Sequence, residues 1–347
     1  MSNKPPIEVP QGAIRLNTDS QKLEFYAQDR WYEMATDVPT LDGDSSTKMG
    51  GGVRGLFFGG NNGSSYDDIE HITLSTQANA TDFGNMTTSG HVAAGTCASR
   101  TRGLVAGGAP SVTDTIEFVT ISSTGNGTDF GNLTDGRDFL GGLSNQTRGC
   151  FNGGRIVTPA TKTNIIDFVT IATLGNALDF GDTRNVIGNY PMMCASPTRG
   201  ILGGGVSPVV TDIDFITITS KGNGQDFGSL AINQGGVGAS NSYRGIFAGG
   251  YNPSLTSNTS FITIATLGNS NNFGDLTVAR RGIGAAASST RAAFGGGQHP
   301  SSPNNTNTID YVAIATTGDA IDFGDLGQSN SGQKRNVSGC SNGHGGL

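Results

Sequence analysis

The stretch TRGLVAGG at residues 101–108 has close copies elsewhere in the chain, among them VRGLFFGG at 53–60 and YRGIFAGG at 243–250. Each copy places an arginine ahead of a short apolar run that ends in two glycines. The arginine recurs at intervals of 48, 46, 51, 45 and 47 residues, at Arg54, Arg102, Arg148, Arg199, Arg244 and Arg291. Because self-similarity at a nearly fixed period indicates a repeat architecture, the chain is predicted to contain six similar units.

A second marker, Asp-Phe-Gly or Asn-Phe-Gly, follows each arginine in the same order, at 82–84, 129–131, 179–181, 226–228, 272–274 and 322–324. The copy that begins at Arg244 divides into four strand-like segments, GIFAGG (245–250), SFITIATL (260–267), NNFGDL (271–276) and RRGIGAAAS (280–288). Four strands per unit and this period are typical of β-propeller blades. The Gly- and Ala-rich segment is predicted to lie innermost, where strands are crowded.

Ring closure is also predicted from the two ends of the repeat region. The repeats begin at residue 53 without a preceding small-residue segment. The last residues, KRNVSGCSNGHGGL (334–347), match such a segment, but no further arginine and apolar run follow it. The C-terminal strand is therefore expected to complete the first blade, and such closure removes open sheet edges. The predicted fold is an all-β, six-bladed propeller preceded by a short N-terminal β-hairpin arm.

The order R-x-G-x-G-A-A, an apolar run with Gly-Gly, and I-x-x-V-x-I resembles the kelch repeat. This resemblance covers residues from about 46 to 347 and implies a propeller in which a glycine pair closes the second strand of each blade. The chain departs from the pattern because it lacks the repeated Tyr and Trp of typical kelch blades. Its single tryptophan, Trp31, lies outside the repeats, and the Phe of Asp-Phe-Gly is expected to fill the packing position of the kelch tryptophan.

The N-terminal segment GAIRLNTDSQKLEFYAQDRWYEM (12–34) reads as a β-hairpin with a polar turn, followed by a third short strand or a clamp. It is too short to build its own core, so its aromatic residues need a partner surface. That surface is either the propeller or another chain. The residues concerned are Phe25, Tyr26, Trp31 and Tyr32. The predicted domains are an anchoring arm at 1–34, a Gly/Ser/Asp linker at 35–52 and the propeller at 53–347.

The same N-terminal segment resembles a short segment found in tail-fibre and other virion proteins of tailed bacteriophages, where it precedes a receptor-binding or adhesive part. The resemblance implies a virion protein assembled in the host cytoplasm. The partners it implies are other virion proteins bound through the arm, further copies of this chain in a homo-oligomer or multi-copy assembly, and a glycan or protein of the host surface.

Composition excludes several function classes. Charged residues are 14% of the 347-residue chain and the net charge is −7, with no basic stripe, so no nucleic-acid partner is expected. The apolar runs are too short to insert into a membrane, and the first residues lack the apolar core of a signal peptide.

The repeated motifs are predicted to be structural rather than catalytic. A phosphate-binding loop requires a helix after its glycines, and no helical period follows here. The arginines are expected to brace loops or neighbouring blades, with the Asp of Asp-Phe-Gly as a candidate partner. That Asp is expected to cap a turn. A metal site in the Asp-Phe-Gly-Asp loops, Asp179 with Asp182 or Asp322 with Asp325, is the remaining alternative.

The cysteines and histidines show no catalytic arrangement. Cys97, Cys194 and Cys340 share one column of the innermost strand and are expected to be buried thiols without disulfides. The histidines are scattered and are expected on surfaces or in turns, at His71, His91, His299 and His344. No enzyme activity, cofactor or metal is predicted.

Binding is predicted at one face of the ring. In a four-stranded antiparallel blade, the loop between the second and third strands shares a face with the link between blades, and in this chain both vary between copies. The loops of the opposite face, such as ATLGNALDFG (172–181), are nearly constant. Loops on a rigid scaffold commonly carry function, although unconstrained loops also drift. The candidate binding residues are Tyr66, Arg155, Lys162, Tyr190, Tyr251, Asn252, His299 and Asn304.

These observations favour a tail-fibre or appendage protein that displays a propeller for host attachment. The alternative is a purely architectural decoration, connector or baseplate protein without a receptor-binding role. A secreted glycan-processing enzyme is disfavoured because no acid/base constellation and no signal peptide are apparent.

Overall fold

The computed structural model describes residues 13–17, 22–27, 30–33, 53–88, 91–157, 160–231, 235–251, 253–301, 304–327 and 332–343. These residues form β-strands joined by turns and contain no α-helix, which confirms the predicted all-β class. No helix in this part of the chain could therefore cross a membrane. The chain divides into two compact units, Met1–Leu41 and Asp42–Leu347.

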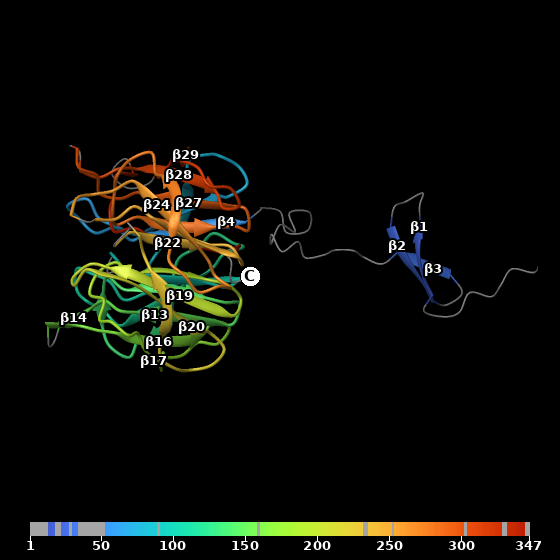
Figure 1. Cartoon of the computed structure of the whole chain (residues 1–347), viewed down its shortest axis with the longest axis horizontal. Helices are drawn as coiled ribbons and strands as arrows, with labels where there is room; N and C mark the ends of the chain where they lie inside the picture. The colour runs from blue at the N-terminus through green and yellow to red at the C-terminus, as the bar shows by residue number, and fades with distance from the viewer. Residues whose placement is uncertain are drawn as a thin grey trace, which may run out of the picture. The chain divides into compact units, whose positions relative to one another are not determined.

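The smaller unit is a three-stranded antiparallel sheet (Figure 1). Its strands are β1 (Ile14–Asn17), β2 (Lys22–Ala27) and β3 (Arg30–Glu33), in that order. Tyr26 pairs with Trp31 across β2 and β3, and their rings meet edge to face at 5.3 Å between centroids. The segment therefore forms three strands, of which the first two make the predicted hairpin.

Six antiparallel sheets of four strands each make up most of the described part of the larger unit. The first sheet contains β30 (Ser338–Ser341), β4 (Arg54–Phe58), β5 (Asp68–Thr73) and β6 (Thr81–Asn85). The second contains β7 (Gly95–Ala98), β8 (Arg102–Ala106), β9 (Thr115–Thr120) and β10 (Thr128–Asn132). The third contains β12 (Gly141–Ser144), β13 (Arg148–Asn152), β16 (Ile165–Thr170) and β17 (Leu178–Asp182).

The remaining sheets follow the same plan along the chain. The fourth contains β18 (Met192–Ala195), β19 (Arg199–Gly205), β20 (Val210–Thr217) and β21 (Gln225–Ser229). The fifth contains β22 (Val237–Ser240), β23 (Arg244–Ala248), β24 (Asn258–Thr263) and β25 (Asn271–Asp275). The sixth contains β26 (Gly284–Ala287), β27 (Arg291–Gly295), β28 (Thr308–Ala313) and β29 (Ile321–Asp325). A small additional sheet joins β11 (Arg137–Asp138), β14 (Arg155–Val157) and β15 (Ala160–Lys162).

The four predicted segments of a unit all become strands, with small shifts at their ends. β24 begins two residues before the predicted segment 260–267 and stops at Thr263, because the chain then turns with Thr266 N donating to Thr263 O. The glycine pair follows β23 directly, with φ of 63° at Gly249 and 122° at Gly250. This left-handed backbone is costly for other residues, which explains why two glycines end each copy.

The Asp-Phe-Gly motif is a β-bulge on the outer strand of every sheet. In the second sheet the register between β9 and β10 shifts between Asp129 and Gly131, so Phe130 is the extra residue. The same shift occurs at the motif in the other five sheets. Bulges bend and blunt edge strands, which discourages pairing with another chain.

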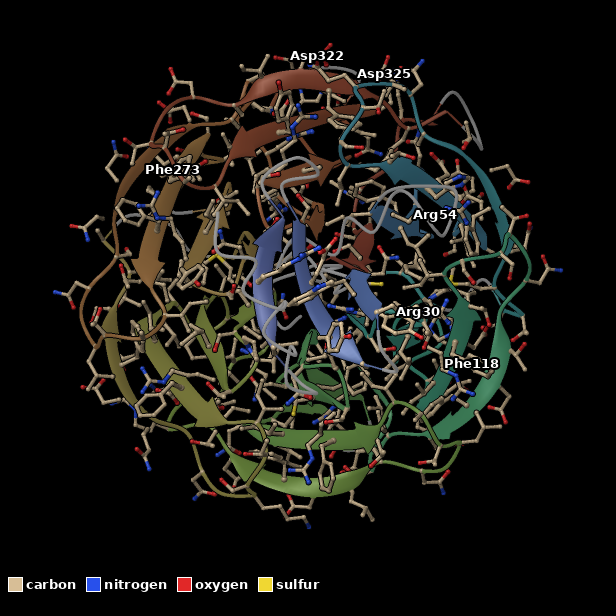
Figure 2. The ribbon with its side chains drawn as sticks, turned by 90° about the vertical axis from the view of Figure 1, so that its right-hand side faces the viewer. Arg30, Arg54, Phe118, Phe273, Asp322 and Asp325 are labelled. Atoms are coloured by element: carbon tan, nitrogen blue, oxygen red, sulfur yellow. The ribbon has the colours of Figure 1, made fainter. Side chains whose placement is uncertain are left out.

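The inner strands of the six sheets contact one another in a closed cycle. The order is β30, β7, β12, β18, β22, β26 and back to β30. β30 pairs with β4, so the last described strand of the chain completes the first sheet. Figure 2 shows the sheets arranged around a common centre.

The core lies between neighbouring sheets. Six clusters of buried side chains each draw on two adjacent sheets, and the Phe of every Asp-Phe-Gly motif belongs to one of them. In one cluster Leu56 and Phe83 of the first sheet pack with Val105 and Ile121 of the second. The expected burial of this Phe between sheets is confirmed.

Candidate functional site

One side of the ring, which carries the nearly constant loops, is occupied by contacts between sheets. Gly125 N of the second sheet donates to Phe83 O of the first at 2.8 Å, and Asn126 Oδ1 accepts from Asn85 N at 3.0 Å. The Asn contact recurs all round the ring, with Asp319 replacing Asn in the sixth sheet. The constancy of these loops is therefore explained by packing.

The repeated arginines also join neighbouring sheets. Arg102 Nη1 donates to Ile171 O of the third sheet at 2.9 Å, and its guanidinium lies 4.6 Å from the centroid of the Phe118 ring of its own sheet. Arg54, labelled in Figure 2, donates to Ile121 O at 2.9 Å in the same way. The arginines thus brace adjacent sheets as predicted, but the expected partner was wrong, because the acceptors are main-chain carbonyls rather than the Asp of Asp-Phe-Gly.

The Asp residues of that motif do not assemble a metal site among the described residues, where no group of three or more His, Cys, Asp or Glu side chains could hold an ion. Asp322 and Asp325 lie on the outer strand β29 (Figure 2). Asp182 N instead donates to Asn223 Oδ1 of the next sheet at 3.1 Å.

The opposite side, which we call the variable side, carries the loops between second and third strands and the links between sheets. These two sets of segments are bonded together, since Gly108 N donates to Arg137 O at 2.9 Å and Gly250 N donates to Arg280 O at 2.8 Å. The predicted grouping of both segments on one side is therefore supported by direct contacts.

Buried ion pairs lie beneath this side and were missed from the sequence. Arg137 Nη2 bonds Asp167 Oδ2 at 2.6 Å, and Arg280 Nη2 bonds Asp310 Oδ2 at 2.8 Å, with all four side chains inaccessible to solvent. Lys334 occupies the same position in the first sheet and bonds both Asp68 and Glu70. A sequence signal for these ion pairs was nevertheless present. An Asp or Glu recurs as the second residue of IEHIT, IEFVT, IDFVT, IDFIT and IDYVA.

His91 occupies that cation position in the second sheet, so its expected place on a surface or in a turn was wrong. The residue is fully buried, with Nδ1 2.6 Å from Gly107 O and Nε2 3.1 Å from Glu117 Oε1. Burial alone would raise the pKa of Glu117, but hydrogen bonds from His91 and Thr87 outweigh it, and the pKa lies below its ordinary value. This pair holds the link between the first two sheets.

Six equivalent positions around the centre of the variable side share a left-handed backbone. Their φ values are 55° at Ala93, 56° at Phe139, 54° at Tyr190, 65° at Gly235, 65° at Gly282 and 56° at Asn336. Glycine adopts this conformation freely, whereas bulky residues do so at a cost of about 1–3 kcal/mol. The surrounding structure therefore holds the two aromatic residues, Phe139 and Tyr190, in a strained backbone conformation.

Tyr190 reaches across this centre. Its hydroxyl donates to Asn336 Oδ1 at 2.8 Å, although the two residues belong to the fourth and first sheets, which are opposite in the cycle. The Tyr190 ring meets Phe139 edge to face at 4.9 Å, and the Arg155 guanidinium lies 4.9 Å from the Phe139 ring centroid. Arg155 is also held by two bonds to Asp138, at 2.9 and 2.6 Å.

Burial raises the pKa of Tyr190, while the positive charges of Arg281, Arg335 and Arg155 oppose that rise. Arg281 lies 5.0 Å from the Tyr251 ring centroid, and its Nε donates to Gln298 Oε1 at 3.2 Å. Asn61 joins this group, because its Oδ1 accepts from Asn336 Nδ2 at 3.3 Å and its main-chain O accepts from Asn305 Nδ2 at 3.5 Å. We define the mouth patch as Asn61, Phe139, Arg155, Tyr190, Tyr251, Arg281, Asn305, Arg335 and Asn336.

A narrow cavity of about 80 Å³ lies under the patch and is lined by residues of all six inner strands or the segments before them. It is too small for a drug-sized ligand, since such sites measure about 300–1,000 Å³. Cys97, Cys194 and Cys340 pack further along the inner strands as buried free thiols, as predicted. Burial raises the pKa of the Cys150 and Cys340 thiols to about 12, which makes them inert at neutral pH.

The structure brings together some of the predicted binding residues and not others. Arg155, Tyr190 and Tyr251 belong to the mouth patch, but Tyr190 is half-buried there and its hydroxyl is bonded to Asn336. Tyr66 and His299 are half-buried, Asn304 is exposed, and Lys162 Nζ donates to Ser207 Oγ at 2.8 Å. Asn252 and His344 lie outside the described residues. The other members of the patch were not predicted: Asn61, Phe139, Arg281, Asn305, Arg335 and Asn336.

In the arm, Trp31 and Tyr32 are half-buried within their own small sheet. The Arg15 guanidinium lies 4.1 Å from the Trp31 ring centroid, and Arg30 Nε donates to the Tyr32 hydroxyl at 2.7 Å. Phe25 lies in β2 and pairs with Tyr32 through the backbone register.

Comparison with known proteins finds no protein-family model that matches this chain and no curated protein that matches it.

Proposed function

We propose that residues 53–347 form a six-bladed, kelch-like β-propeller, and that the chain is a structural protein of a tailed-phage virion. Six four-stranded sheets in a closed cycle, each with a glycine pair after its second strand, support the propeller. The resemblance of residues 12–34 to tail-fibre proteins supports the virion location. In this proposal residues 1–34 anchor the chain and 35–52 link it to the propeller.

The propeller attaches the particle to the host surface through the variable side. The observation that carries this proposal is the mouth patch, where aromatic rings, amides and arginines converge on rigid elements. The opposite side is committed to contacts between sheets, so the loops free to differ between copies gather on one side. Tyr and Asn are suited to adaptable polar recognition.

The arm is proposed to bind other virion proteins or further copies of the chain. A unit this short buries too little surface to be stable alone, so it is expected to need a partner. Ile14 is 63% exposed in it, which leaves apolar surface for a partner.

The test compares virus particles that carry single substitutions. Tyr251→Ser is expected to lower adsorption to host cells several-fold. Tyr243→Ser is the matched control, because Tyr243 is 67% exposed on the constant side, and it is expected to leave adsorption unchanged. Particle incorporation is expected to fail when residues 1–34 are deleted.

Two results would argue against the proposal. Equal adsorption of both tyrosine variants, with the arm still required for incorporation, would favour a purely architectural decoration, connector or baseplate protein. Normal incorporation without residues 1–34 would remove the anchoring role.

A further inference from the structure

Two arginines of the mouth patch lack a carboxylate partner among the described residues. Arg281 and Arg335 occupy equivalent positions in the sixth and first sheets, each directly before a left-handed residue, and both are half-buried. The two segments are adjacent, since Val337 N donates to Gly282 O at 3.3 Å. No ion pair joins either arginine to a described residue, and the undescribed residues between 53 and 343 include no Asp or Glu.

The fully buried cations of the variable side are arranged differently from these two half-buried arginines. Arg137, Arg280 and Lys334 each bond a carboxylate directly beneath the links. The chain has a net charge of −7, so acids are not scarce. Both positive charges act on Tyr190, and neither guanidinium is neutralised by a described carboxylate. An oxyanion bound beside Tyr190 would therefore gain charge-assisted hydrogen bonds from these arginines.

Polar groups beside the arginines are suited to hydroxyl groups. Asn305 is 8% exposed, its Nδ2 donates to Asn62 Oδ1 at 3.0 Å, and its Oδ1 has no partner among the described residues. Such an orphaned acceptor is costly unless a donor reaches it. Tyr251, 40% exposed beside Arg281, adds a flat apolar face of the kind that packs against a sugar ring.

We propose that the mouth patch binds an acidic glycan, with its oxyanion on Arg281 and Arg335 and its hydroxyl groups on Asn305 and the neighbouring amides. A planar guanidinium group can donate two parallel hydrogen bonds to a carboxylate or to a phosphate, so the anion of the glycan can be either group. A protein partner fits less well, because protein interfaces are anchored by large apolar side chains and the patch exposes only Tyr251. This inference rests on the proposed attachment function.

The test measures binding of the full-length protein to immobilised, hydroxyl-bearing polymers. Polygalacturonate supplies carboxylates, its methyl ester is the uncharged match, and poly(glycerol phosphate) supplies phosphates. The wild-type protein is expected to bind at least one charged polymer and not the ester, with affinity that falls as salt is added. Arg281→Gln with Arg335→Gln is expected to weaken that binding by about tenfold or more.

Arg100→Gln is the matched control, because Arg100 is exposed on the constant side and its loss changes the net charge in the same direction. Circular dichroism on heating checks that every variant is folded. The preferred charged polymer identifies carboxylate or phosphate as the anion. The inference is overturned if the ester binds equally, if Arg100→Gln weakens binding as much as the double variant, or if polyglutamate binds more tightly than either of the two charged polymers.

Failure of this inference is distinguishable from failure of the attachment function. If adsorption requires Tyr251 but the protein does not bind the acidic polymers, the attachment role is kept and the acidic glycan is excluded. The opposite result is also informative. If the protein binds the polymers through Arg281 and Arg335 but the Tyr251 variant adsorbs normally, the glycan site is kept and the attachment role is excluded.

Discussion

Gly142 shows how one residue permits the inner strands to meet. A Cβ atom at this position would collide with the main-chain oxygen of Thr96 on the neighbouring inner strand. Gly238 and Gly339 make equivalent close approaches to Met193 and Ala285. Glycine therefore alternates with a larger residue around the ring, because two side chains cannot share each contact.

Gly142→Ala is expected to lower the free energy of unfolding by about 1–3 kcal/mol, the usual cost of overpacking. Gly125→Ala is the matched control, since a Cβ atom added there would meet no other atom within 4 Å and the backbone is not left-handed. Urea unfolding followed by circular dichroism measures both. Equal stability of the two variants would contradict the close-approach argument.

Glu117 links stability to pH through its contact with His91. The pKa of Glu117 lies below the ordinary 4.5, so its contribution to stability is present above about pH 4.5 and is lost as the pH falls through the folded-state pKa. Glu117→Gln is expected to lower stability at pH 7 by about 1–3 kcal/mol, because His91 and Thr87 lose a charged acceptor.

The same variant is also expected to show a weaker loss of stability on acidification than the wild type. Urea unfolding at pH 7, 5 and 3.5 measures both effects. Parallel losses of stability in the two proteins would show that Glu117 does not carry the acid sensitivity.

At the scale of the elements, each second strand is joined to the next sheet by its arginine. Arg102 combines a hydrogen bond to Ile171 O with stacking on Phe118, so it ties β8 to both its own sheet and the third sheet. The bulge at Asp-Phe-Gly then brings the outer strand close to the next loop, where Gly175 N donates to Phe130 O at 2.9 Å. Regular repetition of these contacts makes the six sheets interdependent.

Arg102→Ala is expected to destabilise the protein by about 1–2 kcal/mol, the combined size of one hydrogen bond and a partly buried cation–π contact. Arg102→Lys is expected to recover only part of this, because lysine lacks the planar group that stacks and donates together. Arg100→Ala, an exposed neighbour, is expected to stay within about 0.5 kcal/mol of the wild type. Thermal unfolding compares the three, and full recovery by lysine would refute the stacking contribution.

At the scale of the whole molecule, the cycle of sheets is completed by residues far apart in sequence. β30 pairs with β4, and Lys334 reaches Asp68 at 2.7 Å and Glu70 at 2.9 Å. Burial raises the pKa of Glu70 and the charge of Lys334 opposes that rise. Loss of this segment would leave an open edge and buried carboxylates without their cation.

Deletion of residues 334–347 is expected to abolish cooperative unfolding and to cause association through the exposed edge of β4. Deletion of 344–347 alone is the control, and it leaves β30 intact. Size-exclusion chromatography and thermal unfolding report both changes. A monomeric, cooperatively unfolding product from the longer deletion would show that closure is dispensable.

Much of this architecture could be predicted because it depends on local, repeated chemistry. The glycine pairs, the Asp-Phe-Gly bulges and the small-residue strands recur at a regular interval, and each imposes its structure through backbone sterics within a few residues. The buried His91 was misjudged because its partner, Glu117, is 26 residues away and no local signal marks the pair.

The sequence by itself determined the all-β class, the four strands of each unit and the side of the ring on which loops vary, because period, glycine placement and apolar runs act locally. Only the tertiary structure decided which of those loop residues meet. Tyr190 and Asn336 are 146 residues apart and touch because their sheets are opposite in the cycle. Arg281 and Arg335 instead lie on adjacent links, because the cycle closes between the sixth and first sheets. Both kinds of contact follow from the geometry of the closed cycle, which no short stretch of sequence encodes.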